Sequence, residues 1–261
     1  MEITLEELGL ADMIRLQDRV AETLRRRFGR LVALCFTDIV GSTAHFTSAG
    51  EASGRALQQR HFDLLDHVVR TFGGRIVDTA GDGGFMAFDR IEQAAKAMIE
   101  LQNLISGQNS SRSRTEQLSV RCGLHWGDVL TDGVAVKGQD VNLCARVANS
   151  GLGGEVRLTR EAHAELPASQ RARCRSLHFL ELKGLLEPVE VMVLDWRDRS
   201  LFPATVRNDV TGELIALPDR DAISFGRLGE KQGPDANDVV LLHTDPALTR
   251  QISRWHFELR R

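Results

Sequence analysis

The sequence predicts an α+β fold in which helices cover one face of a β-sheet. Apolar, β-rich runs and helix-periodic runs follow one another in the order β-α-β-β-α-β. A glycine-rich stretch, DTAGDGG at residues 78–84, stands between two of the strand-like runs and predicts a hairpin. The chain has 261 residues, of which 42% are hydrophobic, so it is long enough for one large domain and a smaller one.

The first elements are a connecting helix, a strand and a second helix. Residues 1–29 form the connecting segment, in which apolar side chains recur at helical spacing over 4–28 and end in an arginine triplet. Its apolar stripe fits a dimer seam and a strip packed on its own domain equally well. The β-rich run LVALCFTDI (31–39) predicts a strand, and apolar residues at helical spacing over 57–72 predict the helix after it.

A hairpin, a helix and a strand complete the series. RIVDT (75–79) and GFMAF (84–88) pair around the turn at 81–84, because glycine adopts the positive φ that such turns need. IEQAAKAMIELQNLI (91–105) predicts a helix, and LSVRCGLHWGDVL (118–130) predicts a strand followed by a turn.

The rest of the chain predicts further elements and a second domain. DVNLCARVANS (140–150) is typical of a helix, whereas EVRLT, RCRSLHFLELK and VEVMVLD are typical of strands that extend the sheet. The first domain is therefore expected over residues 30–197, as a ferredoxin-like unit with an extended mixed sheet. DRSLFP (198–203) contains a proline and predicts a linker, and residues 204–261 show strand and turn patterns with no helix.

Charge and cysteine usage exclude several classes of partner. The net charge is −3 with both signs interspersed, so nucleic acid is not an expected partner. The four cysteines lie far apart without a C-x-x-C, so neither a zinc site nor a disulfide framework is expected, and a reducing cytoplasm fits best. No signal peptide and no run of roughly 20 apolar residues is present, so no membrane contact is expected of this chain.

Two aspartates are expected at one end of the sheet. Asp38 ends the first strand and Asp82 stands in the hairpin turn, so their carboxylates converge if the two strands are neighbours. Oxygen ligands of this kind suit Mg²⁺ or Mn²⁺, which keep part of their coordination shell for water and substrate phosphates. Taken singly, each aspartate is more often a routine turn residue.

The helix predicted at 140–150 presents an amide and a guanidinium together. Asn142 and Arg146 are four residues apart and therefore share one face of the helix. This pair suits a ribose and a phosphate, because a guanidinium is a forked donor of fixed charge. On spacing alone, an exposed helix face with a solvated arginine is the simpler interpretation.

Five short motifs in a fixed order favour a functional site over routine turns and an exposed helix face. Together they resemble the catalytic domain of class III nucleotidyl cyclases over about residues 30–195. The motifs are FTDIVGST (36–43), GDGGFMAF (81–88), RCGLHWGDV (121–129), GQDVNLCARV (138–147) and LKGLLEPVEV (182–191). The resemblance implies an enzyme that closes a nucleoside triphosphate to a 3′,5′-cyclic mononucleotide, with ATP favoured over GTP.

The resemblance also implies a role for individual residues. Asp38 and Asp82 would bind two Mg²⁺ or Mn²⁺ ions, with the backbone carbonyl of Ile39 as an additional ligand. Asn142 would orient the ribose and Arg146 would stabilise the transition state. Lys183, in the fifth motif, would contact the terminal phosphates.

The resemblance further implies a homodimer with two shared active sites. The metal-binding aspartates of one chain would face Asn142 and Arg146 of the other. A different class of function is a cyclase-like regulatory scaffold that dimerises but binds nucleotide poorly.

The positions that read the base depart from the family pattern. The resemblance places Asp78 and Ala135 where adenylyl cyclases usually carry Lys and Asp or Thr. An ionised aspartate only accepts hydrogen bonds, so it suits guanine N1–H and N2–H₂ or adenine N6–H₂, and alanine offers no polar group. Pyrimidine N–H groups would fit an acceptor as well. The alternative is that Asp78 is a hairpin residue that points to solvent, with the base held by stacking and backbone groups.

The C-terminal segment resembles the first part of a forkhead-associated (FHA) domain, a β-sandwich that binds phosphothreonine peptides. The matching runs are GELIALPDRDAISFGRLGE, NDVVL and ISRWHFEL. The resemblance implies phosphate contacts from Arg227, Ser253 and Arg254, and a structural role for His256. It covers fewer strands than the family usually has, and a β-extension of the first domain is the alternative.

Overall fold

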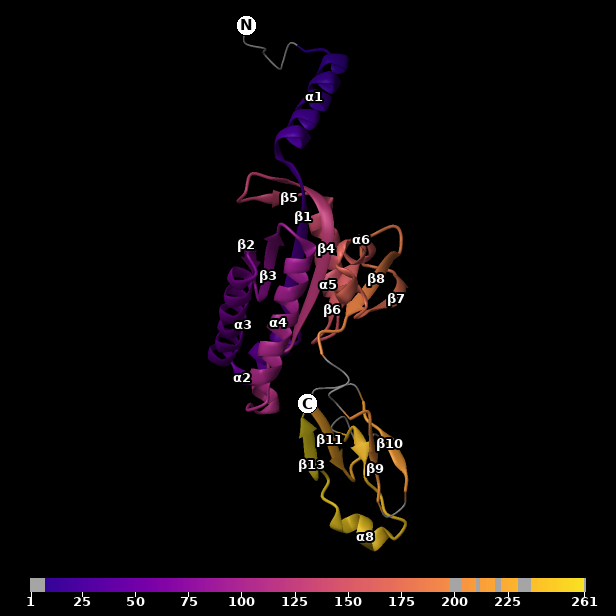
Figure 1. Ribbon diagram of the computed structural model, residues 1–261. Coiled ribbons are helices and arrows are strands. Elements are labelled where there is room, and N and C mark those ends of the chain that lie inside the picture. Colours follow the sequence, from indigo (N-terminus) through magenta and orange to yellow (C-terminus); the bar gives the residue numbers. More distant parts are fainter. Residues whose placement is uncertain (1–7, 198–202, 210–211, 219–221, 230–235, 261) are drawn as a thin grey trace. The chain divides into compact units, whose positions relative to one another are not determined.

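The structure is a computed structural model that describes residues 8–197, 203–209, 212–218, 222–229 and 236–260. Two compact units make up the chain, Met1–Trp196 and Arg197–Arg261, and each is described by itself (Figure 1). Most of the expected linker, residues 198–202, lies outside the described residues, as do residues 4–7 of the expected connecting helix.

The first unit contains the expected strands and helices in the expected order. Its strands are β1 (Gly29–Ile39), β2 (Arg75–Ala80), β3 (Gly83–Phe88), β4 (Val120–Thr131), β5 (Val136–Lys137), β6 (Val156–Thr159), β7 (Cys174–Leu180) and β8 (Val189–Leu194). Its helices are α1 (Leu10–Phe28), α2 (Ser42–Ala49), α3 (Glu51–Thr71), α4 (Ile91–Asn109), α5 (Gln139–Asn149), α6 (Arg160–Glu165) and α7 (Ala168–Arg171). The short elements α2, α6, α7 and β5 were not expected from the sequence.

The strands of this unit form one mixed sheet. Their order is β2-β3-β1-β4-β6-β8-β7, with β5 paired to the end of β4. Neighbouring strands run antiparallel except β4 and β6, which run parallel. The first four strands have the order of a ferredoxin-like unit and the remaining strands extend it. The prediction of an α+β fold with an extended mixed sheet is therefore confirmed.

Helices cover both faces of the sheet, so the prediction that they pack on one face is wrong. Ala33 and Cys35 of β1 belong to the core with α3 and α4. Leu34 of β1 packs instead against Cys144 of α5. Successive side chains of a strand point to opposite faces, and β1 is apolar on both, so each face of this strand supports its own helical layer.

Helix α5 lies close to β4 because a glycine stands between them. A Cβ added at Gly123 would lie 2.4 Å from the backbone nitrogen of Ala148. The missing side chain therefore fixes how closely α5, the helix of Asn142 and Arg146, approaches the sheet.

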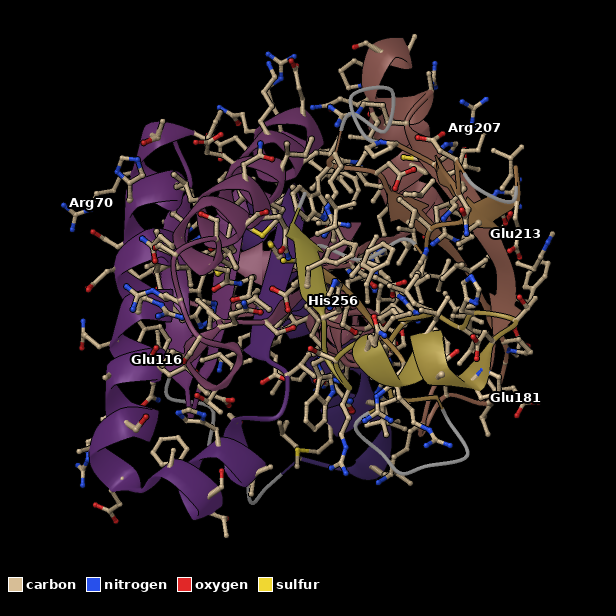
Figure 2. The ribbon with its side chains drawn as sticks, turned by 90° about the horizontal axis from the view of Figure 1, so that it is seen from below. Arg70, Glu116, Glu181, Arg207, Glu213 and His256 are labelled. Atoms are coloured by element: carbon tan, nitrogen blue, oxygen red, sulfur yellow. The ribbon has the colours of Figure 1, made fainter. Side chains whose placement is uncertain are left out.

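Helix α1 has no buried residue, and it extends away from the sheet (Figure 1). Leu10, Met13, Ile14, Val20 and Leu24 are among its exposed apolar side chains. The alternative in which this stripe packs on its own domain is therefore wrong. Charged side chains such as Arg70 of α3 lie at the periphery of the unit (Figure 2). None of the helices in the described ranges has both the length and the apolar composition needed to cross a membrane.

The second unit is mainly β-structure. It contains β9 (Thr205–Arg207), β10 (Leu214–Ala216), β11 (Ala222–Gly226), β12 (Val239–Val240), α8 (Pro246–Gln251) and β13 (Phe257–Arg260). Strands β9 and β10 pair, and a separate sheet has the order β12-β11-β13. Buried Ile223, Phe225 and Val239 form its core.

The helix α8 contradicts the prediction that this segment contains no helix. Asp245 caps it by accepting a hydrogen bond from the backbone of Ala247 at 2.7 Å, and Pro246 follows in the first turn. Six residues are too few to show an apolar period, so only this capping signal marked the helix in the sequence.

Candidate functional site

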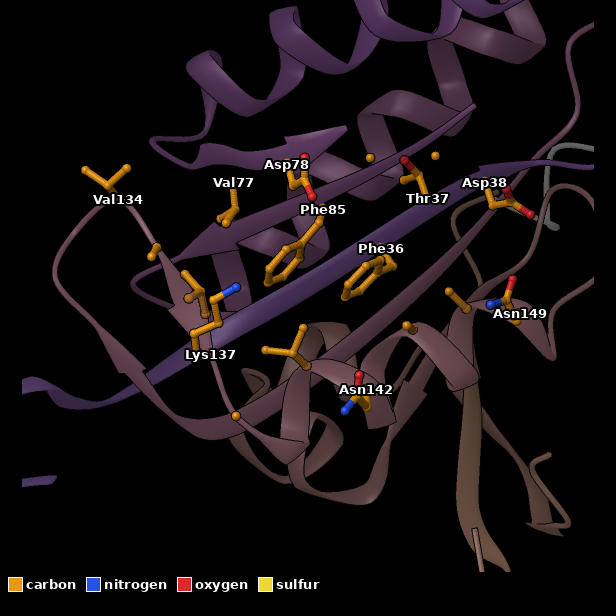
Figure 3. Close-up of a pocket in the computed structure, with 18 residues that line it drawn as sticks. Phe36, Thr37, Asp38, Val77, Asp78, Phe85, Val134, Lys137, Asn142 and Asn149 are labelled. Carbon is orange, nitrogen blue, oxygen red and sulfur yellow. The ribbon is translucent and has the colours of Figure 1, made fainter. Parts of the chain in front are cut away.

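A cavity of about 730 Å³ opens on the face of the sheet that α5 covers. Its walls come from the end of β1, the β2–β3 hairpin, the β4–β5 loop and α5 (Figure 3). The sequence-predicted residues that line it are Asp38, Asp78, Ala135 and Asn142. Pockets for small ligands have volumes of roughly 300–1,000 Å³, so this cavity has the size of a binding site.

The two ends of the cavity differ in chemistry. Asp38 and Asn149 lie at one end, and Val134 and Lys137 lie at the other (Figure 3). Lys137 is the basic residue among the described residues that line the cavity, and its side chain points inward.

Stacked aromatic rings form the floor between these ends. The rings of Phe36 and Phe85 have centroids 4.4 Å apart and are nearly parallel. Each belongs to a strand of the central sheet, so the floor is rigid and apolar.

Asp38 is held by an arginine that the motif analysis did not single out. Arg121 donates from Nε to Asp38 Oδ2 at 2.9 Å and also from Nη2 to the same oxygen. The guanidinium further donates to the carbonyl and to the side-chain oxygen of Asn149, at 2.8 and 2.9 Å. No local sequence signal marks this arrangement, because it depends on the β1–β4 register, which places Arg121 directly opposite Asp38.

Asp82 occupies a turn that α3 holds in place. His61 of α3 hydrogen-bonds the carbonyl of Asp82 through Nδ1 at 3.0 Å, and Gln58 donates to the carbonyl of Gly81. Gly81 has a φ of 62°, the left-handed conformation that glycine tolerates. Burial lowers the pKa of His61 from the ordinary 6.5 to about 4, so the ring is neutral at pH 7.

The two aspartates lie at the same end of the sheet, as expected for neighbouring strands. Thr37 of β1 pairs with Gly84 of β3 in antiparallel register, so Asp38, the next residue of β1, and Asp82, which precedes β3, lie beyond the same side of that pair. The side-chain oxygen Oδ2 of Asp82 is buried without a hydrogen-bond partner in the described part of the chain. Ile39 ends β1 with its side chain in the core, so only its backbone is available to a ligand.

Arg146 and Lys183 do not line the cavity that Asn142 lines. A Cβ added at Gly184 would lie 3.2 Å from each terminal nitrogen of Arg146, so the loop that follows Lys183 contacts this guanidinium. Arg146 Nη1 is buried without a partner in the described residues, and Lys183 is exposed.

Asp78 and Ala135 lie at the cavity wall, but neither has a specific polar contact to another element. Asp78 is exposed, and its carboxylate accepts a hydrogen bond from the backbone of the adjacent Thr79 at 2.8 Å. Ala135 belongs to a turn in which Asp132 accepts its backbone N–H at 2.8 Å. Both are therefore available to a ligand in the cavity.

In the second unit, the residues expected to bind phosphate come from adjacent segments. The backbone of Arg227 donates to the carbonyl of Ser253 at 3.1 Å. Asn237 is buried and donates to the carbonyl of Arg254 at 2.6 Å. His256 donates from its backbone N–H to the carbonyl of Phe225 at 2.7 Å.

The comparisons with known proteins agree with this description. Residues 26–195 match the family model described as the adenylate and guanylate cyclase catalytic domain. A putative adenylate cyclase of Rhizobium meliloti is 22% identical over 84% of this chain and 37% of its own length. A receptor-type adenylate cyclase of Trypanosoma equiperdum is 28% identical over 63% of this chain and 44% of its own length. The chain thus spans less than half the length of these relatives.

Solved structures share the fold. An adenylate cyclase structure from Trypanosoma brucei matches with a TM-score of 0.56 at 23% identity, over 73% of this chain and 95% of that one. An adenylyl cyclase from P. aeruginosa matches with a TM-score of 0.56 at 20% identity, over 65% of this chain and 96% of that one. The family model covers more than half of the chain, including the whole mixed sheet. This chain therefore belongs to the adenylate and guanylate cyclase catalytic domain family.

Proposed function

We propose that this chain is a nucleotidyl cyclase that converts a nucleoside triphosphate, with ATP favoured, into a 3′,5′-cyclic mononucleotide and pyrophosphate. The observation that carries the proposal is the single cavity lined by Asp38, Asp78, Ala135 and Asn142. Relatives named as adenylate cyclases support ATP, and conversion of GTP is the alternative.

Asp38 and Asp82 are the proposed metal ligands, with the carbonyl of Ile39. The unpartnered oxygen of Asp82 fits this role, because a buried anionic oxygen without a donor is costly unless a cation satisfies it. No cluster of three His, Cys, Asp or Glu occurs among the residues the structure describes, so water and substrate phosphates would complete the coordination. Two bound Mg²⁺ or Mn²⁺ ions would lower the pKa of the attacking hydroxyl and neutralise charge on the triphosphate.

The remaining site residues would bind and orient the substrate. Asn142 would hold the ribose so that its 3′-oxygen faces the α-phosphorus, where a new P–O bond forms as the bond to pyrophosphate breaks. Arg146 would offset the charge on the α-phosphoryl oxygens, and Lys183 would contact the terminal phosphates. The unpartnered Nη1 of Arg146 gives it a donor to spare for this purpose.

We propose a homodimer with shared sites, in which Asp38 and Asp82 of one chain face Asn142 and Arg146 of the other. Arg146 and Lys183 do not line the cavity of their own chain, which supports a contribution from a second copy, whereas Asn142 lines the same cavity as Asp38. The exposed apolar stripe of α1 supports this assembly, since pairing with a second copy would bury it.

The test of the proposed function is a turnover assay with ATP, GTP, CTP and UTP in the presence of Mn²⁺. We expect cyclic product and pyrophosphate in equal amounts, with at least a hundred-fold loss in Asp82→Asn, because removal of a key charged group costs about 10²–10³ in rate. Asp63→Asn, an exposed carboxylate of α3, is the matched control and should retain activity. Absence of product with every nucleotide would favour the regulatory scaffold.

We propose in addition that the second unit binds a phosphothreonine peptide through Arg227, Ser253 and Arg254. Arg227 follows β11, and its Nε is buried without a partner in the described residues. Ser253 and Arg254 are exposed in the turn before β13, and the carbonyl of Ser253 accepts the backbone N–H of Arg227. Binding of phosphothreonine peptides that unphosphorylated peptides do not show, and its loss in Arg227→Ala, would support the proposal. Equal binding of both peptides would refute it.

A cytoplasmic location is proposed from the cysteines. All four are free thiols, and three are buried. Burial raises the pKa of Cys122 to about 12, so this thiol stays protonated and unreactive.

A further inference from the structure

Arg121 joins two parts of the site that the sequence treats separately. Its guanidinium contacts Asp38 at the end of β1 and Asn149 at the end of α5. Helix α5 is the helix of Asn142 and Arg146. One side chain thus connects a proposed metal ligand to the element that presents the ribose and phosphate groups.

The contacts to Asp38 are asymmetric. Both donors of Arg121 go to Oδ2, and the other oxygen, Oδ1, has no hydrogen bond in the described part of the chain. Asp38 is among the residues that line the cavity, so Oδ2 is engaged by the arginine while Oδ1 keeps its capacity to accept a ligand. A forked guanidinium imposes this orientation, whereas a single ammonium does not.

Stability alone does not account for the pair. The side chains of Arg121 and Asp38 are 25% and 27% exposed, and an ion pair in such a partly buried position is weak evidence for stability, because the cost of desolvating both charges offsets much of their attraction. A second arginine, Arg157, already braces the same end of α5 by donating to Ser150 while it pairs with Glu155. Glu155 does not line the cavity, whereas Asp38 does. Of the two arginines, only Arg121 therefore holds a proposed metal ligand.

We propose that Arg121 is a positioning residue that fixes Asp38 through Oδ2 and leaves Oδ1 for the metal. The inference rests on the proposed cyclase function. In the proposed homodimer, Asp38 serves one site while α5 of the same chain serves the other. Arg121 therefore sets the geometry of the metal ligand in one site and tethers the substrate-binding helix of the second.

Direct binding of Mn²⁺ tests the inference without turnover. The free Mn²⁺ is measured by electron paramagnetic resonance in the presence of 3′-deoxy-ATP, which lacks the attacking hydroxyl. Loss of a group that orients a metal ligand typically weakens metal binding 10–100-fold, so Arg121→Gln should raise the Kd for Mn²⁺ about ten-fold or more. Arg121→Lys keeps the charge but not the fork, and we expect a loss between wild type and Arg121→Gln. Arg157→Gln should stay within about two-fold of wild type, since its carboxylate is not a proposed ligand.

Mixed dimers give a second, independent readout. One intact site forms when Asp38→Ala and Arg146→Ala chains combine, and its Asp38 comes from the Arg146→Ala chain. Adding Arg121→Gln to that chain should reduce the activity of the mixture more than adding it to the Asp38→Ala chain. No loss of activity when Arg121→Gln is added to the Arg146→Ala chain would show that Arg121 does not act through Asp38.

Other outcomes overturn the inference as clearly. Unchanged Mn²⁺ binding in Arg121→Gln would mean that the arginine does not orient the metal ligand, and tighter binding would mean that it competes with the metal. An equal loss in Arg157→Gln would mean that both arginines only support the fold. If Arg121→Gln fails to fold, as judged by circular dichroism, Arg121→Lys decides the question. A wild-type protein that neither binds Mn²⁺ nor forms product would refute the proposed function instead.

Discussion

Asp78 is the residue at which the base preference of the site can be tested. It lines the cavity and makes no contact beyond the adjacent backbone. If it accepts from the base, Asp78→Lys should raise the ratio of ATP to GTP in kcat/KM, because lysine donates to adenine N1 but repels guanine N1–H. One polar contact is worth about 1–3 kcal/mol, so the ratio should change roughly ten-fold or more.

A matched control separates this effect from added charge. Thr79 is the next residue of β2, and its side chain leaves the strand on the opposite side, so Thr79→Lys adds the same group away from the cavity. An unchanged ratio in Asp78→Lys with activity intact would return Asp78 to the role of a hairpin residue.

His61 makes a prediction about acid stability. Its pKa is about 4 in the folded protein because burial disfavours the charged ring, and about 6.5 in the unfolded chain. The unfolded state therefore binds more protons between these values, so the free energy of unfolding should fall as the pH drops from 6.5 to 4, by about 3 kcal/mol. Urea denaturation at several pH values should show this fall in wild type and a shallower one in His61→Gln. The same slope in both proteins would contradict the prediction.

At the scale of elements, the approach of α5 to β4 is the most sensitive contact. Gly123→Ala would place a methyl group 2.4 Å from the backbone nitrogen of Ala148. Because this atom belongs to the backbone, no change of side-chain rotamer can relieve the clash. Overpacking of this kind costs typically about 1–3 kcal/mol, and it would also displace Asn142 from the cavity. We expect a lower melting temperature and reduced turnover.

Gly107 of α4 provides the control, since a Cβ there meets nothing within 4 Å. Gly107→Ala should be neutral or stabilising by up to about 1 kcal/mol, because alanine favours the helix. Similar melting temperatures for the two variants would show that α5 has room to adjust.

Helix α1 makes a prediction about assembly. Leu10, Met13, Val20 and Leu24 fall on the a and d positions of a heptad, with Gln17 at the intervening a position, and all four apolar side chains are exposed. Leu24→Glu should weaken the dimer about ten-fold or more in sedimentation experiments, since it places a charge in an apolar seam. Glu22→Gln, on the outer side of the helix, should leave the dimer unchanged. A dimer that tolerates Leu24→Glu would place the interface elsewhere.

At the scale of the whole molecule, the question is whether one chain holds a complete site. Asp38→Ala and Arg146→Ala should each be nearly inactive alone and regain activity when mixed, because a mixed dimer rebuilds one intact site of two. Statistical pairing sets the recovery at about a quarter of wild type, provided that activity of each intact site is unaffected by its neighbour. Failure to complement, with both variants folded and dimeric, would place the site within a single chain.

The sequence by itself determined the order of the elements and the positions that matter for the site. The apolar run of β1, the glycine turn around Asp82 and the spacing of Asn142 and Arg146 are local signals, and local signals suffice to predict strand, turn and helix face. The ordered motifs then indicated the family, which the match over residues 26–195 shows. The short helix α8 was not predicted, because six residues are too few to show the apolar periodicity of a helix.

Only the tertiary structure decided which of these groups meet. Asp38 and Arg121 are 83 residues apart, and their ion pair exists because the β1–β4 register places them opposite each other. The same register brings Gly123 beneath α5, so that a helix covers the second face of the sheet, and the packing of α3 brings His61 to the turn of Asp82. Register and packing depend on contacts between distant segments, and a shift of one residue in a strand would turn every side chain to the opposite face. Local sequence patterns carry no information about contacts between distant segments. The sequence therefore did not distinguish Arg121 from any other strand residue.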